Sequence, residues 1–222
     1  MLLSIFKENL YSKPELLNEA LLLGIVYLYN GNTYCQNSIL NELIADRSNS
    51  AFISLKNLIR NIGNFLIEVR KFKENEKKRD FSFKIVDSYD HFDRKENILV
   101  KMFGHKADKF EIQTELNYEL ALCRTFRFLQ LFCENNNIEM KKFVMNQTND
   151  NGEQKITTIN FILEASQLLR QFFKIMSIKI VNIPPSILDF INEITQIPCV
   201  GCQKSFMRST FFEDMSYMAG FF

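Results

Sequence analysis

The sequence predicts an all-α protein, and three observations support this prediction. The chain of 222 residues has only 7 Gly and 4 Pro, so it has few turn-forming residues. It has 22 Phe, which bring a large apolar area to bury. Its apolar residues recur at the three- and four-residue spacing of amphipathic helices rather than alternating as in strands. Few turns and helical spacing together favour long helices packed on each other.

The first predicted helix covers 14–29. Pro14 suits a first helical turn, and Ser12 is a candidate cap. Asn30-Gly31-Asn32 then predicts a turn, because Asn and Gly both tolerate positive φ. A second helix is expected to run to about Ala45, followed by a polar break.

The third predicted helix has the clearest pattern. Its apolar residues follow a 3-4 spacing that keeps them in one narrow stripe: Phe52, Leu55, Ile59, Ile62, Leu66 and Val69. Three successive helices joined by short turns predict antiparallel stacking. Residues 71–107 are charge-dense at first and then lose any lasting period, which predicts a charged linker or insertion with partial order.

Helical spacing returns after this insertion. The Asn135-Asn136-Asn137 triplet predicts the end of a long helix, because Asn competes for backbone hydrogen bonds and favours caps. A second break is expected at the Pro184-Pro185 pair. The helices predicted between these breaks and the chain end are 108–133, 138–146, 156–180, 187–196 and a last amphipathic helix after a turn at 198–201.

Helix pairs without a strand layer predict an armadillo/HEAT-like solenoid segment with a partly irregular charged insert. No fixed repeat period is visible, so any repeats are degenerate. The predicted divisions are a helical segment at 1–70, the linker at 71–107 and a second helical domain at 108–222. The last helix reaches Phe222 without a cap, from which we expect a domain truncated at its C-terminus.

Bulk properties exclude some classes of function. The formal net charge of +1 gives no strong field for nucleic acid or an anionic membrane. The longest apolar run, Ala20 to Tyr29, is shorter than the roughly 20 residues that a spanning helix needs, so we expect no transmembrane span. The start of the chain meets Lys7 and Glu8 too early to form a secretory signal.

Five cysteines, an odd number partly placed in apolar patterns, indicate a reducing compartment and no disulfide framework. Cys199 and Cys202 have the spacing of metal ligands, but no second pair accompanies them. We interpret them as part of a structural turn, with a metal site, a disulfide and a redox pair as alternatives.

No catalytic, cofactor or metal site is predicted, and no enzymatic activity. The chain has no glycine-rich phosphate loop. Its two histidines, His91 and His105, both fall in the irregular insert. The acidic pairs Glu213-Asp214 and Glu134 near Glu139 are interpreted as solvated charge.

The basic end of the third helix suggests one protein partner. Residues Ala51 to Asp80 combine the apolar stripe with Arg70-Lys71, Lys73 and the run 77–79. A basic amphipathic helix can dock in a calmodulin-like groove. The alternative is a solvated helix end whose cations oppose the negative carbonyl terminus.

Two parts of the chain resemble a known family. The order Phe128-Leu129-Gln130-Leu131, Cys133-Glu134-Asn135, Asn137, then Thr157-Thr158-Ile159-Asn160, then Cys199, Gly201, Gln203 and Ser205 resembles the RIH-associated domain of inositol trisphosphate receptors and ryanodine receptors. Residues 17–62, with Leu23-Gly24-Ile25, Asn30-Gly31-Asn32 and Gln36, are similar to the helices that precede this domain. The chain departs from the family in its Lys-rich insert, in Cys202 and in Ile197, where the channels usually have Gly.

The resemblance implies a segment of a tetrameric intracellular calcium-release channel, on the cytosolic face of the endoplasmic reticulum. The segment would transmit conformational change between ligand-binding and pore regions, with the other domains and subunits of the channel as partners. It implies no ligand or pore residue in this chain and leaves the receptor branch open. The alternative is a stand-alone cytoplasmic helical scaffold derived from the family.

Overall fold

The structure is a computed structural model that describes residues 13–83, 107–175, 182–213 and 216. These residues form helices and turns, with one isolated β-bridge between Thr148 and Gln154. The predicted all-α class is confirmed for this part of the chain. Its elements are α2 (Pro14–Tyr27), the 3-10 turn η2 (Tyr29–Gly31), α3 (Thr33–Ala45), α4 (Ser50–Phe83), α6 (Ala107–Cys133), the 3-10 turn η3 (Glu134–Asn136), α7 (Ile138–Met145), α8 (Phe161–Ile175), α9 (Ile183–Thr195) and α10 (Val200–Met207).

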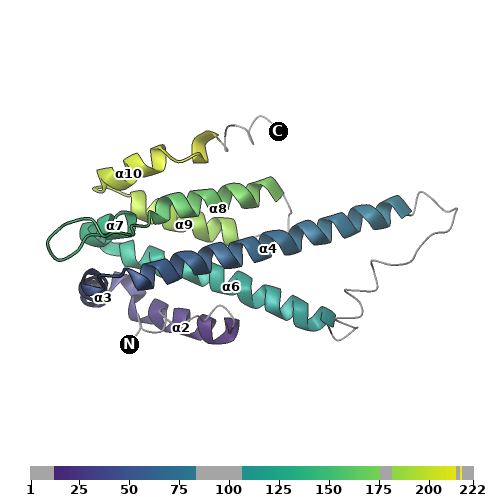
Figure 1. The fold of residues 1–222 in the computed structure, drawn as a ribbon, viewed down its shortest axis with the longest axis horizontal. Coiled ribbons are helices and arrows are strands. Elements are labelled where there is room, and N and C mark those ends of the chain that lie inside the picture. Colours follow the sequence, from purple (N-terminus) through teal and green to yellow (C-terminus); the bar gives the residue numbers. More distant parts are fainter. Residues whose placement is uncertain (1–12, 84–106, 176–181, 214–215, 217–222) are drawn as a thin grey trace.

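The helices form three layers (Figure 1). One layer contains α2, α6 and α9, with α6 in contact with both of the others. A second contains the short helices α3, α7 and α10, with α7 in the middle. The third contains α4 and α8, side by side. Helix α4 also contacts α6. The two helices run antiparallel, as shown by the pairing of Phe65 with Tyr118 and of the later Arg70 with the earlier Glu115.

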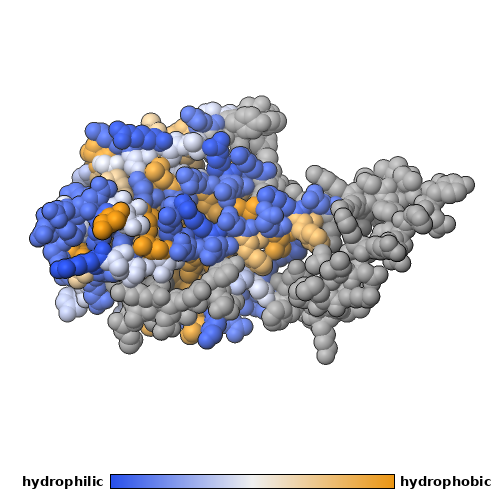
Figure 2. All heavy atoms as spheres, in the orientation of Figure 1, coloured by the Kyte–Doolittle hydropathy of each residue, from blue (hydrophilic) through white to orange (hydrophobic). Residues whose placement is uncertain are grey.

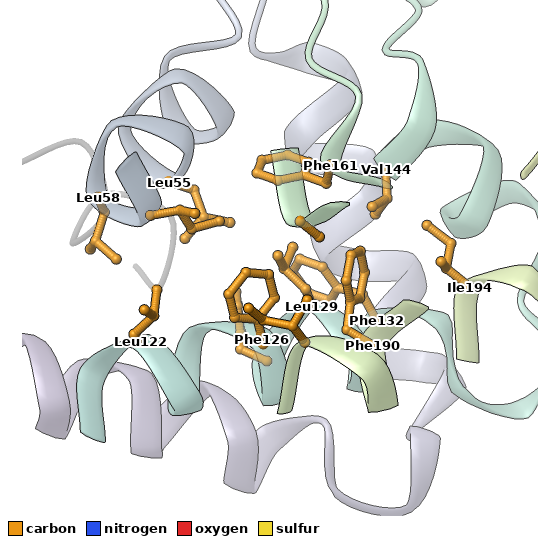
Figure 3. Close-up of a cluster of buried hydrophobic side chains, with 14 of the residues drawn as sticks. Leu55, Leu58, Leu122, Phe126, Leu129, Phe132, Val144, Phe161, Phe190 and Ile194 are labelled. Atoms are coloured by element: carbon orange, nitrogen blue, oxygen red, sulfur yellow. The ribbon is translucent and has the colours of Figure 1, made fainter. Parts of the chain in front are cut away.

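The layers enclose one apolar core (Figure 3). Phe126 of α6 lies against Phe190 of α9, with ring centroids 6.0 Å apart. Phe52 of α4 meets Phe161 of α8 edge to face at 5.0 Å. The two helical segments on either side of the predicted linker therefore share a single hydrophobic core. The division of the chain into a segment at 1–70, a linker at 71–107 and a domain at 108–222 therefore stays a prediction.

Two predicted helix starts are wrong. The predicted helix 156–180 begins only at Phe161. Helix α9 begins at Ile183, because Pro184 and Pro185 occupy its first turn, where a missing backbone N–H costs nothing. The linker predicted at 71–107 stays a prediction, because helix α4 continues through residues 71–83, which include the predicted basic end of the third helix, and residues 84–106 lie outside the described residues.

The late start of α8 is caused by a contact with the segment that precedes it. The Gln147 side-chain oxygen accepts the Ile159 backbone N–H at 2.6 Å, which holds the chain in a loop. The Asn160 side chain then accepts the backbone N–H groups of Ile162 and Leu163, so that it caps the helix. Two side-chain hydrogen-bonding groups therefore override the apolar pattern of 156–160. Ser12, the candidate cap of the first helix, lies outside the described residues.

Candidate functional site

Two turns of the same shape lie against each other and form the candidate site. In the α2–α3 turn, Asn30 and Gly31 both have positive φ, at 55° and 60°. In the α6–α7 turn, Asn135 and Asn136 have φ of 59° and 57°. Non-glycine residues adopt this left-handed conformation rarely, and Asn does so more readily than most. The predicted turn at 30–32 and the predicted helix end at 135–137 are both confirmed.

Each turn ends in an asparagine that caps the next helix. The Asn32 side-chain oxygen accepts the Cys35 backbone N–H at 3.3 Å, and that of Asn137 accepts the Met140 backbone N–H at 3.1 Å. Both satisfy N–H groups that the first turn of a helix leaves free. The same local code therefore starts α3 and α7.

Side chains from the second turn reach the backbone of the first. The Asn135 side-chain amide donates to the carbonyl oxygens of Asn30 at 2.8 Å and Gly31 at 3.0 Å. Gly31 is buried, and a Cβ atom there would lie 2.6 Å from Asn135 Nδ2. Glycine is therefore required both by its φ and by the close approach of the second turn.

Gln36 connects the two turns from the other direction. Its side chain is fully buried, and its Nε2 donates to the carbonyl oxygens of Leu131 at 2.8 Å and Glu134 at 3.1 Å. Its Oε1 accepts from Asn137 Nδ2 at 2.9 Å. Buried amides that make all these bonds fix the relative position of the two helices, because each lost bond would leave a buried polar group unpaired.

A buried ion pair joins α7 to α9 at the position that corresponds to Gln36 on α3. Lys141 follows Asn137 by the same four positions as Gln36 follows Asn32. Its side chain is fully buried, and Nζ lies 3.6 Å from Oε1 of Glu193 on α9. We call the set Asn30, Gly31, Gln36, Asn135, Asn137, Lys141 and Glu193 the turn ladder. It links α2–α3 to α6–α7, and α6–α7 to α9.

The electrostatics of the ladder reflect burial. Burial raises the pKa of the Glu193 carboxyl above its ordinary value; Lys141 opposes the rise and Glu134 adds to it. Burial likewise raises the pKa of the neighbouring Cys133 thiol, against the attraction of Lys141. A thiol held in its protonated form is a poor nucleophile. These groups suit a fixed structural contact better than acid–base or nucleophilic chemistry.

The Cys199–Cys202 pair lies at the start of α10. The structure joins the two sulfur atoms as a disulfide, and both residues are buried. The expectation of a turn without a disulfide is therefore corrected, and the disulfide alternative is the one the structure shows. The reason is that Cys199 occupies the N-cap position of α10 and Cys202 lies one helical turn later, which brings the side chains together.

The other residues considered from the sequence do not come together. Glu134 pairs with Arg127, and Glu139 pairs with Lys142 on the surface. Glu213 is exposed. His91, His105 and Asp214 lie outside the described residues. Among the side chains that the structure does describe, no group of three or more His, Cys, Asp or Glu is placed to hold a metal ion.

The basic helix end is partly occupied by acidic residues of α6. Arg70 lies 2.9 Å from Glu115 and 3.7 Å from Glu119, and Lys73 also pairs with Glu115. Burial raises the pKa of Glu119, Arg70 opposes this and Glu115 adds to it. The apolar stripe of the same helix is buried, with Phe52 and Ile62 at 2% and 0% exposure. The apolar stripe within residues 51–73 therefore packs on this protein's own core; the side chains of 76–80 lie outside what the structure describes.

Sequence reasoning missed the two central residues of the ladder, Gln36 as a buried connector and Lys141 as a buried cation. Polar residues on short amphipathic helices are normally assigned to the solvent side. The available signal was positional, since each follows a capping Asn by four residues in the turns Asn30-Gly31-Asn32 and Asn135-Asn136-Asn137.

Two further findings bear on what this arrangement does. No helix within the described ranges combines the length and apolar character needed to cross a membrane. Residues 117–219 match the family model described as RyR and IP3R Homology associated. The matched region begins within α6 and includes the Asn135 turn, Lys141, Glu193 and the Cys199–Cys202 pair.

Proposed function

We propose, from the match of residues 117–219 to the family described as RyR and IP3R Homology associated, that the chain is a cytosolic helical-solenoid segment of an intracellular ligand-gated calcium-release channel. The segment passes conformational change between the ligand-binding and pore regions. It acts through its contacts with the remaining domains and subunits, at the cytosolic face of the endoplasmic reticulum. The proposal assigns it no ligand site, pore site or catalytic role.

The observation that carries the proposal is the turn ladder. Asn135 and Asn30, 105 residues apart, are joined by a hydrogen bond between corresponding turns. A module that transmits movement must resist bending between its layers, and the buried Gln36 amide, which is paired at both of its side-chain atoms, supplies that resistance beside the exposed Asn135 bond. Packed cores respond to force by shifting between discrete arrangements rather than by deforming gradually. The ladder thus supports motion of the layers as one body.

The layered arrangement supports the solenoid part of the proposal. Helices in corresponding places, α2 with α6 and α3 with α7, contact each other. In a solenoid each unit buries its apolar face against its neighbours. Helix α6 shares its core with α2 on one side and α9 on the other, which fits such stacking (Figure 3).

The test is made in the cells that express the protein. An epitope tag on the chromosomal gene reports whether the chain migrates in detergent with a very large membrane complex, and store-calcium release is recorded after the channel agonist is added. Gln36→Glu, which loses the Nε2 donor, should blunt agonist-evoked release, whereas the exposed Ser38→Ala should not. A tagged protein that runs at 26.2 kDa, with calcium release unaltered by Gln36→Glu, favours the stand-alone scaffold instead.

A calmodulin-like partner at Ala51–Asp80 would require the α4 stripe to leave the core. We therefore expect calcium-loaded calmodulin to bind the isolated peptide more tightly than the folded chain. Isothermal titration of both against the same calmodulin measures the difference. Equal affinity for peptide and folded chain would show that the docking surface is the exposed basic face of α4 and not its apolar stripe.

A further inference from the structure

The helix–turn–helix unit α2–α3 corresponds position by position to the unit α6–α7. The separation of 105 residues that joins Asn30 to Asn135 also relates the buried residues of α2 to those of α6. Leu17, Leu21 and Leu28 are fully buried on α2. Their counterparts Leu122, Phe126 and Cys133 are fully buried on α6. The two helices therefore present the same inner stripe, in addition to the same turn.

The third unit, α9–α10, follows the second in the same way. Cys199 occupies the N-cap position of α10 as Asn137 occupies that of α7, although the Cys199 side chain makes no capping hydrogen bond. Counting back from these caps, Ile187, Phe190 and Ile194 correspond to Thr125, Phe128 and Phe132, and all six are buried. The side chain four positions after the cap reaches the next unit in both cases, Gln36 to the Leu131 carbonyl and Lys141 to Glu193. Residues 131 and 193 are themselves counterparts.

Helix α6 is buried on the side that faces α2. Arg124 marks this side, because its Nη1 donates to the carbonyl oxygen of Asn18 on α2 at 2.9 Å. Along the same side lie Ala121, Phe128 and Leu131, at helical spacings of three and four. Their exposures are 0%, 1% and 0%. In the second unit this stripe is thus a contact between units.

The counterparts on α2 are exposed and apolar. Leu16 corresponds to Ala121, Leu23 to Phe128 and Val26 to Leu131, and their exposures are 50%, 37% and 62%. Tyr27, the counterpart of the buried Phe132, is 47% exposed. We call Leu16, Leu23, Val26 and Tyr27 the outer α2 face. Figure 2 shows another face of the molecule, on which hydrophilic and hydrophobic residues are mixed over α8 and α10.

We propose that the outer α2 face docks one further helix–turn–helix unit of the same type, lying against α2 as α2 lies against α6. The unit brings an apolar helix with the spacing of Leu17, Leu21 and Leu28. It also brings a turn with two left-handed residues, whose carbonyl oxygens accept the Asn30 side-chain amide as those of Asn30 and Gly31 accept Asn135. Exposed apolar stripes of this kind mark protein interfaces.

The third unit, α9–α10, has a different surface on the exposed side of α9. The exposed side of α9 carries Asp189 and Asn192, so that Leu188 stands there between polar residues. A terminal repeat with a polar outer side needs no further neighbour, and the exposed apolar residues Ile197 and Val200 of this unit lie outside α9, in the turn and at the start of α10. The partner is therefore assigned to α2 and not to α9.

The test places a photo-crosslinking benzoylphenylalanine at Val26 in the full chain, expressed in the cells that normally make it. After irradiation, the attached peptide is sequenced by mass spectrometry. Phe72, exposed on α4, carries the same crosslinker as a matched control. We expect position 26 to capture a peptide from a helix with apolar residues at i, i+4 and i+11, followed by a two-residue turn rich in Asn or Gly, and position 72 not to capture it.

A second substitution shows whether the contact is specific. Leu23→Asp should reduce the adduct at position 26 at least about tenfold, because a charge buried at an interface costs more than the 1.4 kcal/mol that corresponds to that factor. Thermal unfolding should be nearly unchanged, since Leu23 faces solvent in the isolated chain. The counterpart Phe128→Asp should abolish folding, which confirms the assignment of the two sides.

Several outcomes overturn the inference. They are an adduct with residues 1–13, an adduct with a second copy of this chain, a lipid adduct, or no adduct above that at position 72. The inference extends the proposed function but can fail separately from it. Capture of a helical unit from a protein that is not a channel supports the docking surface and overturns the channel role. Normal channel assembly with no adduct at position 26 supports the channel role and overturns the docking surface.

Discussion

The side-chain amide of Asn135 donates to the carbonyl oxygen of Asn30 at 2.8 Å and so joins two turns that have the same backbone conformation. The bond connects units that are 105 residues apart in the chain. Each turn starts a short helix, and each short helix sends one buried polar side chain to the next unit. The ladder therefore leads to specific expectations about which substitutions loosen the layers.

Gly31→Ala tests the close approach of the two turns. Alanine at φ +60° is strained, and its Cβ would meet Asn135 Nδ2 at 2.6 Å. Gly152 provides a matched control, because its φ is +76° and a Cβ there meets nothing within 4 Å. Left-handed strain alone costs about 1–2 kcal/mol, so Gly152→Ala should lose about that much and Gly31→Ala clearly more. Urea denaturation of both variants measures the difference, and equal losses would contradict the tight contact.

Gln36→Glu tests the buried connector. The substitution keeps the shape but removes the Nε2 donor, and leaves the carbonyl oxygens of Leu131 and Glu134 facing an acceptor. An unsatisfied buried polar group costs about 1–3 kcal/mol, and more if charged. We expect the free energy of unfolding to fall by at least that amount. Ser38→Ala, on the exposed side of the same helix, should change it by less than about 0.5 kcal/mol.

Lys141→Met tests the buried ion pair. It leaves the Glu193 carboxylate, whose pKa burial already raises, without its counter-ion at neutral pH, and removing one partner of a buried pair typically costs about 3–5 kcal/mol. Adding Glu193→Gln removes the carboxylate as well, so most of the stability should return. A double variant that is as unstable as Lys141→Met alone would show that the pair is not coupled.

The same carboxyl predicts a pH dependence. Burial raises the pKa of Glu193 above its ordinary value of 4.5, so the folded state holds this proton more tightly than the unfolded state. The stabilisation from this group is complete below pH 4.5 and is lost as pH rises through the raised pKa. Relative to Glu193→Gln, the wild-type free energy of unfolding should therefore decrease from pH 4.5 toward neutrality. An increase over that range would contradict the sign of the shift.

Leu129→Ala tests the core between layers. Leu129 is fully buried, and deleting its side chain should cost about 2–5 kcal/mol through lost burial and an unfilled cavity. Leu116 on the same helix is 54% exposed, so Leu116→Ala should cost far less. Thermal unfolding of the pair separates packing from helix propensity, because the same change is made in the same helix.

Periodicity and turn chemistry determined the elements of this protein. The helix starting at Pro14, the Asn30-Gly31-Asn32 turn and the end of α6 before Asn135 all follow from local preferences that act within a few residues. The stripe from Phe52 to Leu66 fixed which face of α4 is buried. The family resemblance agrees with the match at 117–219.

Tertiary structure alone decided which polar side chains are buried or interrupt a helix against the amphipathic pattern, and which helix–turn–helix units contact each other. Residues 156–160 leave the helix because Gln147, from the preceding segment, accepts the Ile159 N–H. Gln36 and Lys141 are buried because the next unit closes over them, and no local window of sequence contains that unit. Hydrogen bonds and ion pairs between residues about a hundred positions apart depend on how the layers stack, which periodicity cannot specify.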